Sequence, residues 1–378
     1  MSKQKKPLNI LALEPYYDGS HKAFLDEWIK RSVHHWTLMT LPGYTWKWRM
    51  RHAPITFGEA LRAAQGTPHA YDLIVCSDML NLAEFRGLIP QNMASLPSIV
   101  YFHENQFTYP MRFAKERDYH YAMTNLTTAM AADQVWFNSH FHRDSFLNAA
   151  REFLNRMPDY APIDALVEIR NKSSVHYPGI LAIPKRTNRK PGPCRILWAA
   201  RWEHDKNPDD FFAAIRLLRK QGLDFRLSVI GQSFQDHPQS FRIAKTEFSD
   251  IIEHWGFQKT QTAFWRCLQD ADIAVSTAHH EFFGIGMIEA MTAGAFPLLP
   301  ERLSYPEILN LDQTPSHQCF FYDGTVLSLA NRLKELIQRS DTQPLWQNAP
   351  PIESLLQTYQ WKNAALTMDQ AAAHWPSI

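Results

Sequence analysis

Short apolar runs alternate with amphipathic stretches along most of the chain. Runs such as 8–13, 73–77 and 99–102 are rich in aliphatic residues and short, which is typical of buried strands. Between them lie stretches such as 139–154, whose apolar residues recur at the three- and four-residue spacing of a helix with one buried face. Strands that alternate with helices predict an α/β fold built on parallel, doubly wound sheets.

The alternation occurs twice, on either side of a basic, proline-rich segment. We predict a first domain over residues 1–182, a linker over 183–193 and a second domain over 194–350. A helical tail over 351–378 is expected to pack back on the first domain. The expected architecture is two Rossmann-like domains of ordinary size, facing each other across a cleft.

Three local features are expected within this frame. Residues 243–255 are predicted to form a helix, and the helix that begins near residue 20 is expected to have Ser20 as its N-cap. In residues 44–52, aromatic and basic residues are interleaved, and we interpret this segment as an exposed loop.

The composition excludes several classes of protein. The 378 residues are 45% hydrophobic and 20% charged, with a net charge of +1, so nucleic-acid binding would need a local basic patch. The four cysteines lie far apart, which indicates reduced core residues of a cytoplasmic protein. No apolar run approaches the roughly 20 residues of a membrane helix, and no obligate protein partner is evident.

The stretch 276–294 carries the first chemical signal. A buried strand ends at Ser276, Gly284 and Gly286 open a turn, and a helix runs from Ile285 to the stop at Gly294. In α/β proteins, ligands bind beyond the carboxyl ends of such strands, and the first N–H groups of a helix attract phosphate.

Two glutamates bracket this turn, Glu281 before it and Glu289 one helical turn inside. Carboxylates repel phosphate but accept hydrogen bonds from sugar hydroxyls, so the pair predicts a nucleotide-sugar site. The alternative is that Glu281 caps the helix and Glu289 is solvated.

A second turn, after the strand 195–199, contains Arg201 and Lys206. Two cations at a strand end form a natural clamp for a diphosphate. Taken alone, the same residues also fit an ordinary solvated turn.

Together these residues resemble the family 4 glycosyltransferases of the GT-B fold, which are retaining enzymes that use nucleotide-diphosphate sugars. The resemblance covers about residues 194–310. It depends on the following residues: Arg201, Lys206, Gly231, the spacing of seven residues between Glu281 and Glu289, Phe283-Gly284, and Glu289-Ala290-Met291 with Gly294.

The first half resembles a narrower family, the tRNA-queuosine mannosyltransferases. The matching segments are Glu14-Pro15-Tyr16-Tyr17-Asp18-Gly19-Ser20-His21-Lys22, Trp46-Lys47-Trp48-Arg49, Tyr101 to Gln106, and Phe137-Asn138-Ser139. Tyr17-Asp18 departs from the family pattern, in which Tyr-Gly-Gly is expected. The resemblance implies transfer of mannose from GDP-mannose to the cyclopentenediol of queuosine in a tRNA anticodon.

The resemblance also implies roles for individual residues. Arg201 and Lys206 would hold the donor diphosphate, Glu281 the hydroxyls of the transferred sugar, and Glu289 the ribose. His103, at the end of a central strand, would bond the donor sugar; the alternative is a satisfied core histidine. Further donor contacts are expected from Gly19, Ser20, Gly231, Phe283, Gly284, Ile285, Gly286 and Met287.

The acceptor tRNA is expected on the aromatic and basic segment, because aromatic faces stack unpaired bases and cations hold phosphates. The predicted residues are Trp46, Lys47, Trp48, Arg49, Arg51 and Asn105, with Arg112, Lys115 and Arg117 as an extension. The alternative is a packed tryptophan pair beside a solvated loop. Asp270-Ala271-Asp272 lies at a helix-to-strand junction and is expected to be structural, so we predict neither a metal nor a cofactor.

Two other functions fit parts of the pattern. One is a glycosyltransferase of the same fold that acts on a lipid or a polysaccharide. The other is a non-catalytic tRNA-binding protein with a degenerate donor site. The sequence leaves open which sugar and which nucleobase are bound, although 254–257 is the segment expected to read the base.

Overall fold

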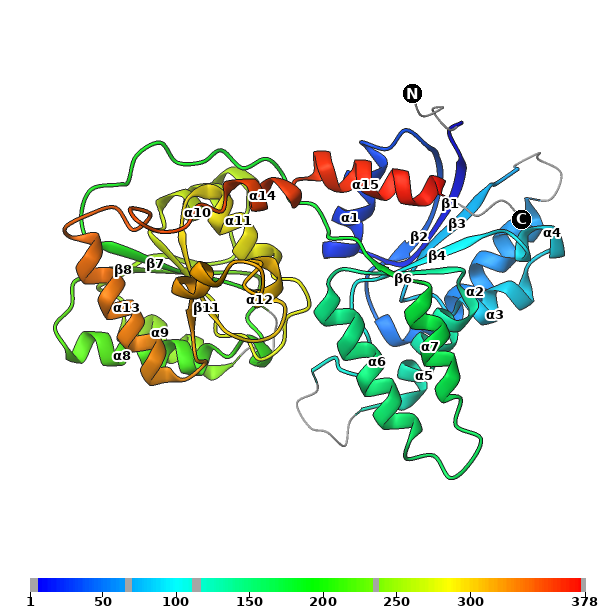
Figure 1. Ribbon diagram of the computed structural model, residues 1–378, viewed down its shortest axis with the longest axis horizontal. Coiled ribbons are helices and arrows are strands. Elements are labelled where there is room, and N and C mark those ends of the chain that lie inside the picture. Colours follow the sequence, from blue (N-terminus) through cyan, green and yellow to red (C-terminus); the bar gives the residue numbers. More distant parts are fainter. Residues whose placement is uncertain (1–5, 65–69, 111–116, 234–237, 375–378) are drawn as a thin grey trace. The chain divides into compact units, whose positions relative to one another are not determined.

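The computed structural model describes residues 6–64, 70–110, 117–233 and 238–374. The chain forms two compact units (Figure 1). The first contains Met1–Gly179 together with Trp361–Ile378, and the second contains Ile180–Gln360. The chain therefore leaves the first unit once, builds the second, and returns.

The first unit contains a six-stranded parallel sheet in the order β2-β1-β3-β4-β5-β6. Its strands are β1 (Asn9–Tyr17), β2 (His35–Pro42), β3 (Leu73–Ser77), β4 (Ser98–Phe102), β5 (Gln134–Phe137) and β6 (Ser173–Val175). Residues of β1, β3 and β4 are almost fully buried because helices cover both faces of a doubly wound sheet.

The helices of this unit are α1 (Gly19–Ile29), α2 (Trp46–Ala63), α3 (Leu82–Leu88), α4 (Gln91–Ala94), α5 (Tyr119–Ala131), α6 (His140–Leu154), α7 (Ile163–Asn171) and α15 (Trp361–Ala373). The last of these comes from the end of the chain and packs on α1. Asp369 of α15 accepts hydrogen bonds from Trp28 Nε1 at 2.8 Å and from the backbone N–H of Val33 at 2.7 Å. The C-terminal helix is thus an integral part of the first unit.

The second unit contains another six-stranded parallel sheet, in the order β12-β11-β10-β7-β8-β9. Its strands are β7 (Cys194–Ala199), β8 (Phe225–Ile230), β9 (Ile252–Gly256), β10 (Ile273–Val275), β11 (Phe296–Pro300) and β12 (Phe321–Tyr322). Its helices are η2 (His204–Lys206), α8 (Pro208–Lys220), α9 (Gln239–Glu247), α10 (Gln261–Asp270), α11 (Ile285–Ala293), α12 (Tyr305–Ile308), η3 (Pro315–Phe320), α13 (Val326–Ser340) and α14 (Glu353–Thr358).

The predicted α/β class and the two parallel sheets are confirmed. Of the predicted C-terminal tail, α14 belongs to the second unit and α15 to the first. The predicted linker segment runs along the second unit, where Arg186 and Arg189 both bind the buried carboxylate of Asp272 at 3.0 Å. All four cysteines are free.

The predicted helix over 243–255 is wrong in its second half. Helix α9 ends at Glu247, and Ile252–Gly256 forms the edge strand β9. Trp255 packs edge-on against Trp202 at a centroid distance of 5.4 Å, so its apolar side chain faces the body of the unit. Apolar residues of a half-buried edge strand therefore continued the helical spacing of the preceding helix.

The segment 44–52 is also different from the prediction, because most of it forms the first two turns of α2. Two local features explain why the sequence pattern did not predict this helix. Thr45, at the N-cap position, makes no capping hydrogen bond with its side chain, and Pro54 lies inside the helix. Helix α1 has Asp18 as its N-cap instead of Ser20, since the Asp18 carboxylate accepts the N–H of Gly19 at 2.8 Å.

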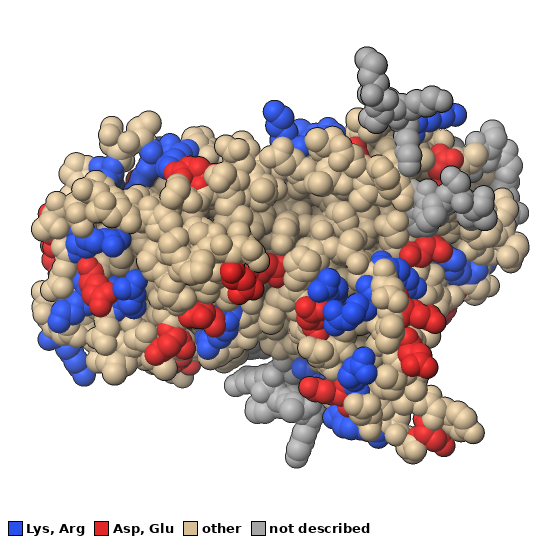
Figure 2. All heavy atoms as spheres, viewed as in Figure 1, with Lys and Arg blue, Asp and Glu red and all other residues tan. Residues whose placement is uncertain are grey.

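No described helix is both long and apolar enough to span a bilayer. Figure 2 shows one face of the protein, on which basic and acidic side chains are interspersed. This mixture agrees with the small net charge of the sequence.

Candidate functional site

Polar residues gather at the carboxyl ends of β7, β8 and β10 in the second unit. After β10 the chain turns through Gly284, which has a φ of 94°, and α11 begins at Ile285. No side chain caps α11, so Glu281 is not the cap that the alternative interpretation required. The first N–H groups of a helix without a side-chain cap are available to a bound anion.

Gly284 is required at this turn for two reasons. Its φ lies in the left-handed region, and a Cβ atom would lie 3.0 Å from the Tyr305 ring. Gly286, two residues further, lies close to β7, since a Cβ there would be 3.3 Å from the Ala199 carbonyl oxygen. The predicted donor residues Phe283 and Met287 are buried, whereas Ile285 is exposed.

Lys206 is the buried cation of this site. Its Nζ donates to the carbonyl oxygen of His280 at 2.8 Å and lies 3.3 Å from Glu281 Oε2 and 3.2 Å from Asp205 Oδ2. Burial opposes its charge, but the carboxylates of Glu281 and Asp205 outweigh burial and raise the pKa of Lys206. The structure therefore brings the predicted residues Lys206 and Glu281 together as an ion pair.

Glu281 shows the reciprocal effect. Burial alone would raise its pKa, but the charge of Lys206 outweighs this and lowers it. The neighbouring His280 has its pKa lowered to about 4 by burial and by Lys206, so this imidazole is neutral at physiological pH. Lys206 and Glu281 thus remain charged in a site that disfavours charge.

Glu289 differs from Glu281. Among the described residues its carboxylate has no hydrogen bond or ion pair, and burial raises its pKa to about 7. A half-buried carboxylate without a partner costs free energy that hydrogen bonds from a ligand would recover. Glu289 lies one turn inside α11, where the resemblance expects a ribose.

Arg201 and Gly231 follow the ends of β7 and β8. The Arg201 guanidinium is about half exposed and lies 3.3 Å from Glu203 Oε2. Gly231 lies so close to the chain after β7 that a Cβ atom would come within 1.7 Å of the Ala200 carbonyl oxygen, so no other residue fits. Arg201 is the cation of this site that is accessible from solvent.

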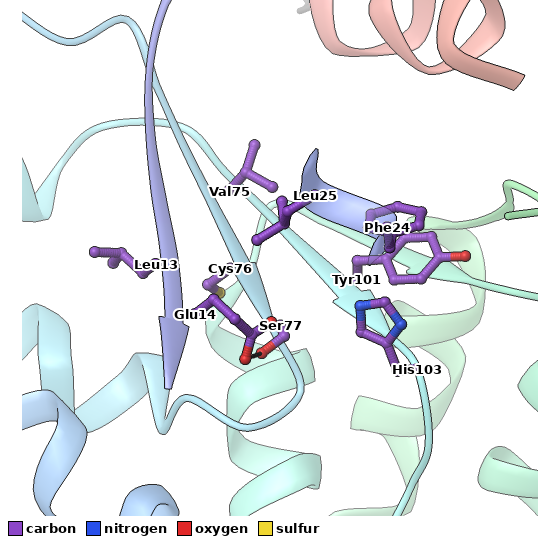
Figure 3. A pocket seen from close by; sticks show the side chains of 9 residues that line it. All are labelled: Leu13, Glu14, Phe24, Leu25, Val75, Cys76, Ser77, Tyr101 and His103. Carbon is purple, nitrogen blue, oxygen red and sulfur yellow. Dashed lines mark hydrogen bonds between the residues drawn. The ribbon is translucent and has the colours of Figure 1, made fainter. Parts of the chain in front are cut away.

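The first unit has its own pocket at the carboxyl ends of β1, β3 and β4. Figure 3 shows its lining, in which the Glu14 carboxylate meets the Ser77 hydroxyl and the His103 ring lies beside Phe24 and Tyr101. Its lining residues are Leu13, Glu14, Phe24, Leu25, Val75, Cys76, Ser77, Tyr101 and His103. His103 therefore lines this pocket and directly follows the end of β4.

Glu14 and His21 were missed as site residues, although both occur in a segment that carried the resemblance. Glu14 is 1% exposed and His21 is 6% exposed, and Glu14 Oε2 lies 3.1 Å from His21 Nδ1. The His21 ring lies 4.0 Å from that of His103 between centroids. An acidic residue within an apolar strand, followed by a histidine on the next helix, was the signal in the sequence.

The other predicted residues of the first unit occupy different environments. Gly19 opens α1 with a φ of 50°, and Ser20 beside it is exposed. Asn105 is fully buried, and its Oδ1 accepts the N–H of Thr108 at 3.0 Å. This amide therefore stabilises the loop after β4.

The predicted acceptor segment presents an aromatic and basic surface on the first turns of α2. Trp48 and Tyr44 are about 60% exposed, and Lys47 and Arg51 are exposed as well. Lys47 and Arg51 both lie over the ring of Tyr121. Trp46 is half-buried and packs edge-on against the same ring, at a centroid distance of 5.1 Å.

Arg49 is the exception in this segment because it is buried. Its Nε donates to the carbonyl oxygen of Pro42 at 2.9 Å, and its guanidinium stacks on the Tyr44 ring at 4.3 Å. Arg49 thus supports the exposed aromatic residue. Arg112 and Lys115 lie outside the described residues, and Arg117 donates to the carbonyl oxygens of Gln106 and Tyr109.

One cluster in the described chain has the composition of a metal site. Single ligand atoms of Glu14, His21 and His103 lie within 4.8 Å of one another. Metal ligands point at a common ion and not at one another. Here Glu14 Oε2 is bonded directly to His21 Nδ1, and the His21 and His103 rings lie against each other with a tilt of 36°. This geometry favours an ion pair beside a neutral ring. Asp272 has a structural role, since it accepts the N–H of Arg195 and binds Arg186 and Arg189.

These features define a class of protein. Two parallel α/β units, with a cationic turn and a glutamate-flanked helix start in the second, are those of a GT-B glycosyltransferase. Solved structures share the fold: that of Anabaena HepE in complex with UDP matches over 98% of this chain and 100% of HepE, with a TM-score of 0.69 at 14% identity. Sucrose-phosphate synthase from Thermosynechococcus elongatus covers 97% with a TM-score of 0.69 and also has 14% identity.

Sequence comparison gives the particular family. Residues 9–180 match the family model described as tRNA-queuosine alpha-mannosyltransferase N-terminal, and residues 180–349 match glycosyl transferases group 1. The tRNA-queuosine alpha-mannosyltransferase of Drosophila melanogaster is 34% identical over 312 residues, which cover 79% of this chain and 81% of the relative. The chain belongs to the tRNA-queuosine alpha-mannosyltransferase family, and the resemblance inferred from its motifs is confirmed.

Part of the chain also matches other mannosyltransferases. A GDP-mannose:cellobiosyl-diphosphopolyprenol alpha-mannosyltransferase from Xanthomonas oryzae is 27% identical over 108 residues, about 28% of each chain. This match is shorter than the one to the Drosophila protein, which extends over most of both chains.

Proposed function

We propose that this protein transfers mannose from GDP-mannose to the queuosine base of a tRNA anticodon, with retention of configuration. The similarity to the Drosophila enzyme along most of both chains supports this proposal most strongly. The intact group of Lys206, Glu281 and Glu289 argues against a non-catalytic tRNA-binding protein with a degenerate donor site.

In this proposal the second unit binds the donor. The N–H groups at the start of α11 and the cations Arg201 and Lys206 hold the diphosphate, and Glu289 accepts hydrogen bonds from the ribose hydroxyls. Glu281 already lies against Lys206, and its remaining lone pairs accept bonds from hydroxyls of the transferred sugar. The donor would therefore complete a set of partners that the protein has partly formed.

The proposed reaction exchanges one bond at the anomeric carbon. An acceptor hydroxyl of queuosine forms the new C–O bond on the same face from which the diphosphate departs. The bond to the diphosphate breaks through an oxocarbenium-like ion pair, and the acceptor proton passes to the departing phosphate oxygen. Arg201 and Lys206 stabilise the charge of the leaving group, so the reaction needs positioning more than a strong base.

The first unit would bind the acceptor. Tyr44 and Trp48 offer exposed aromatic faces for unpaired bases, and Lys47 and Arg51 lie beside them to hold phosphates. No metal has a part in the proposed step. If chelation with EDTA abolished transfer and Mg²⁺ restored it, this part of the proposal would be wrong.

The deciding experiment incubates the purified protein with GDP-[¹⁴C]mannose and total tRNA from cells with and without queuosine. We expect label only in queuosine-containing tRNA. Stabilisation of the protein by GDP-mannose, without label in either tRNA, would keep the glycosyltransferase but reject this acceptor in favour of a lipid or polysaccharide. No label and no stabilisation would reject the whole proposal.

A further inference from the structure

Three polar side chains lie together at the pocket of the first unit, and two of them, Glu14 and His103, line it. Glu14 comes from β1, His21 from α1 and His103 from the end of β4. The hydrogen bond between Glu14 and His21 is 3.1 Å long, and the rings of His21 and His103 lie against each other, with centroids 4.0 Å apart and planes tilted by 36°. His21 therefore has the carboxylate at its Nδ1 and the second imidazole against its ring.

Glu14 has partners for both of its oxygens. Besides the bond from Oε2 to His21, its Oε1 accepts the hydroxyl of Ser77 at 2.9 Å and the backbone N–H of Tyr16 at 2.8 Å. These bonds tie the end of β1 to the end of β3. The carboxylate is thus fixed in position by groups of β1, β3 and α1.

The ring of His103 is held by packing alone. Among the described residues, no side chain or backbone group makes a hydrogen bond to its ring nitrogens, whereas its backbone N–H donates to Asp78 Oδ1 at 2.8 Å. Phe24 contacts the ring edge-on at 5.0 Å and Tyr101 at 4.7 Å. The ring nitrogens of His103 therefore remain available to a substrate.

Several charges influence this ring. Glu14, Asp78 and Glu104 favour a proton on His21, whereas His21 and His142 disfavour one on His103. Burial raises the pKa of the Asp78 carboxyl to about 8, so this group also binds a proton at neutral pH, and burial keeps Tyr101 neutral. Burial opposes protonation of His21, but Glu14 outweighs it and raises the pKa of His21 to about 9. Burial and the charge of His21 hold the pKa of His103 well below its usual value.

We propose that Glu14 and His21 are positioning residues for His103: the Glu14–His21 ion pair holds a proton on His21 and keeps the adjacent His103 ring neutral and oriented. His21 acts as a shield between the carboxylate and His103. Without His21, the Glu14 carboxylate would lie within reach of His103 and would draw a proton onto it.

This inference rests on the proposed function and on the role that the family resemblance implies for His103, a bond to the transferred sugar. A neutral imidazole donates at one nitrogen and accepts at the other, so it can accept a hydrogen bond from a sugar hydroxyl, whereas an imidazolium cannot. The proposed transition state also places positive charge on the sugar, and an imidazolium beside it would repel that charge. A neutral His103 serves both purposes.

The test compares His21→Gln, Glu14→Gln and the double variant with the wild type. Glutamine at 21 keeps a hydrogen-bond donor but loses the charge. The measured quantity is the pH below which the transfer rate falls, the acid limb of the pH–rate profile. In His21→Gln we expect this acid limb to shift to higher pH by roughly one pH unit or more, because His103 then gains the proton that Glu14 attracts. In the double variant the limb should return towards the wild-type position.

The control is His176→Gln, since His176 is another histidine of this unit and stacks on Trp136 at 3.9 Å. This control should leave the acid limb in place. A purely structural role of His21 would lower the rate without moving the limb. Coincident acid limbs in the wild type and His21→Gln would overturn the proposal.

A second measurement does not depend on catalysis. ¹⁵N-histidine NMR of the full chain reports the charge of each ring, with signals assigned from His21→Gln and His103→Gln. We expect wild-type His21 to be an imidazolium near pH 8, because its pKa is raised to about 9, while His103 stays neutral at physiological pH, because its pKa is lowered. A neutral His21 at pH 7 overturns the proposal. If the purified protein transferred no mannose, the proposed function would be refuted. The NMR titration of His103 would still decide this inference.

Discussion

Both units have buried charged groups at the carboxyl ends of their parallel strands. The units differ in whether the partners of these groups belong to the protein. In the first unit, Glu14 has a partner at both oxygens, and His21 takes the charge. In the second unit, Lys206 and Glu281 form a pair, but the half-buried Glu289 has no partner among the described residues, and Arg201 is exposed. The first arrangement sets the state of one ring, and the second leaves groups to be satisfied by a ligand.

The comparison separates positioning from binding. A group whose partners all belong to the protein cannot gain much from a ligand, whereas a desolvated carboxylate without partners can. Variants in the first unit should therefore change pH dependence and stability, and variants in the second should change donor binding and the rate of transfer.

The largest effect is expected from Lys206→Met, which keeps the stem of the side chain but removes its charge. The transfer rate at saturating GDP-mannose should fall roughly 10³-fold, because the cation that stabilises the leaving diphosphate is lost. Single-turnover rates measure this effect. Lys220→Met, at an exposed position on α8, is the matched control, and a loss of less than about threefold in Lys206→Met would contradict the assigned role.

The next effect concerns the stability of the first unit. The folded state raises the pKa of His21 from 6.5 to about 9, so its contribution is fully present below pH 6.5 and is lost as the pH rises to about 9. The contribution corresponds to at most about 3 kcal/mol in the free energy of unfolding. Urea unfolding of the wild type and Glu14→Gln between these pH values measures it, and an equal pH dependence in the two proteins would be evidence against the ion pair.

A smaller effect is expected at Glu289. Because its pKa in the free protein is about 7, it is largely protonated below that pH, and the ionised form is the better acceptor for ribose hydroxyls. The affinity for GDP-mannose should therefore fall as the pH falls through 7. In Glu289→Gln the affinity at pH 8 should be roughly tenfold weaker and nearly independent of pH. Calorimetric titration tests this, with Glu335→Gln on the exposed face of α13 as control.

The smallest effect is expected on the surface of α2. Lys47→Ala and Arg51→Ala should each weaken tRNA binding a few-fold and reduce the slope of log affinity against log salt by about 1. Arg49→Ala should act mainly through stability, because Arg49 is buried against Tyr44 and Pro42. Binding measured at several salt concentrations distinguishes the two cases, and unchanged slopes for Lys47→Ala and Arg51→Ala would argue against a tRNA surface here.

Much of the fold could be predicted because its strands are short, apolar and buried on both faces. The bounds of β3 agree with the run 73–77, and those of β4 agree with the run 99–102 to within one residue. Strand β9 was missed since its residues are only half-buried and continue a helical spacing. Helix α2 was missed because Thr45 does not cap it and Pro54 interrupts its pattern.

The residues of the candidate site were predictable where chemistry and spacing agree, as for Glu281 and Glu289. Their pairing was not predictable, because only the fold brings Lys206 against Glu281 and leaves Glu289 alone. The same limit explains why Glu14 and His21 were missed as site residues. Their burial and the stack on His103 depend on how α1 packs over the ends of β1 and β4.

Because α15 is the last helix of the chain, the first unit can be completed only at the end of synthesis. Trp28 Nε1 and the Val33 N–H belong to the first tenth of the chain, yet their acceptor is Asp369, near its end. A ribosome makes all of the second unit before it reaches that acceptor. Part of the surface of the first unit therefore stays uncovered until the last helix has been translated. A chain that stops after Gln360 leaves this unit incomplete.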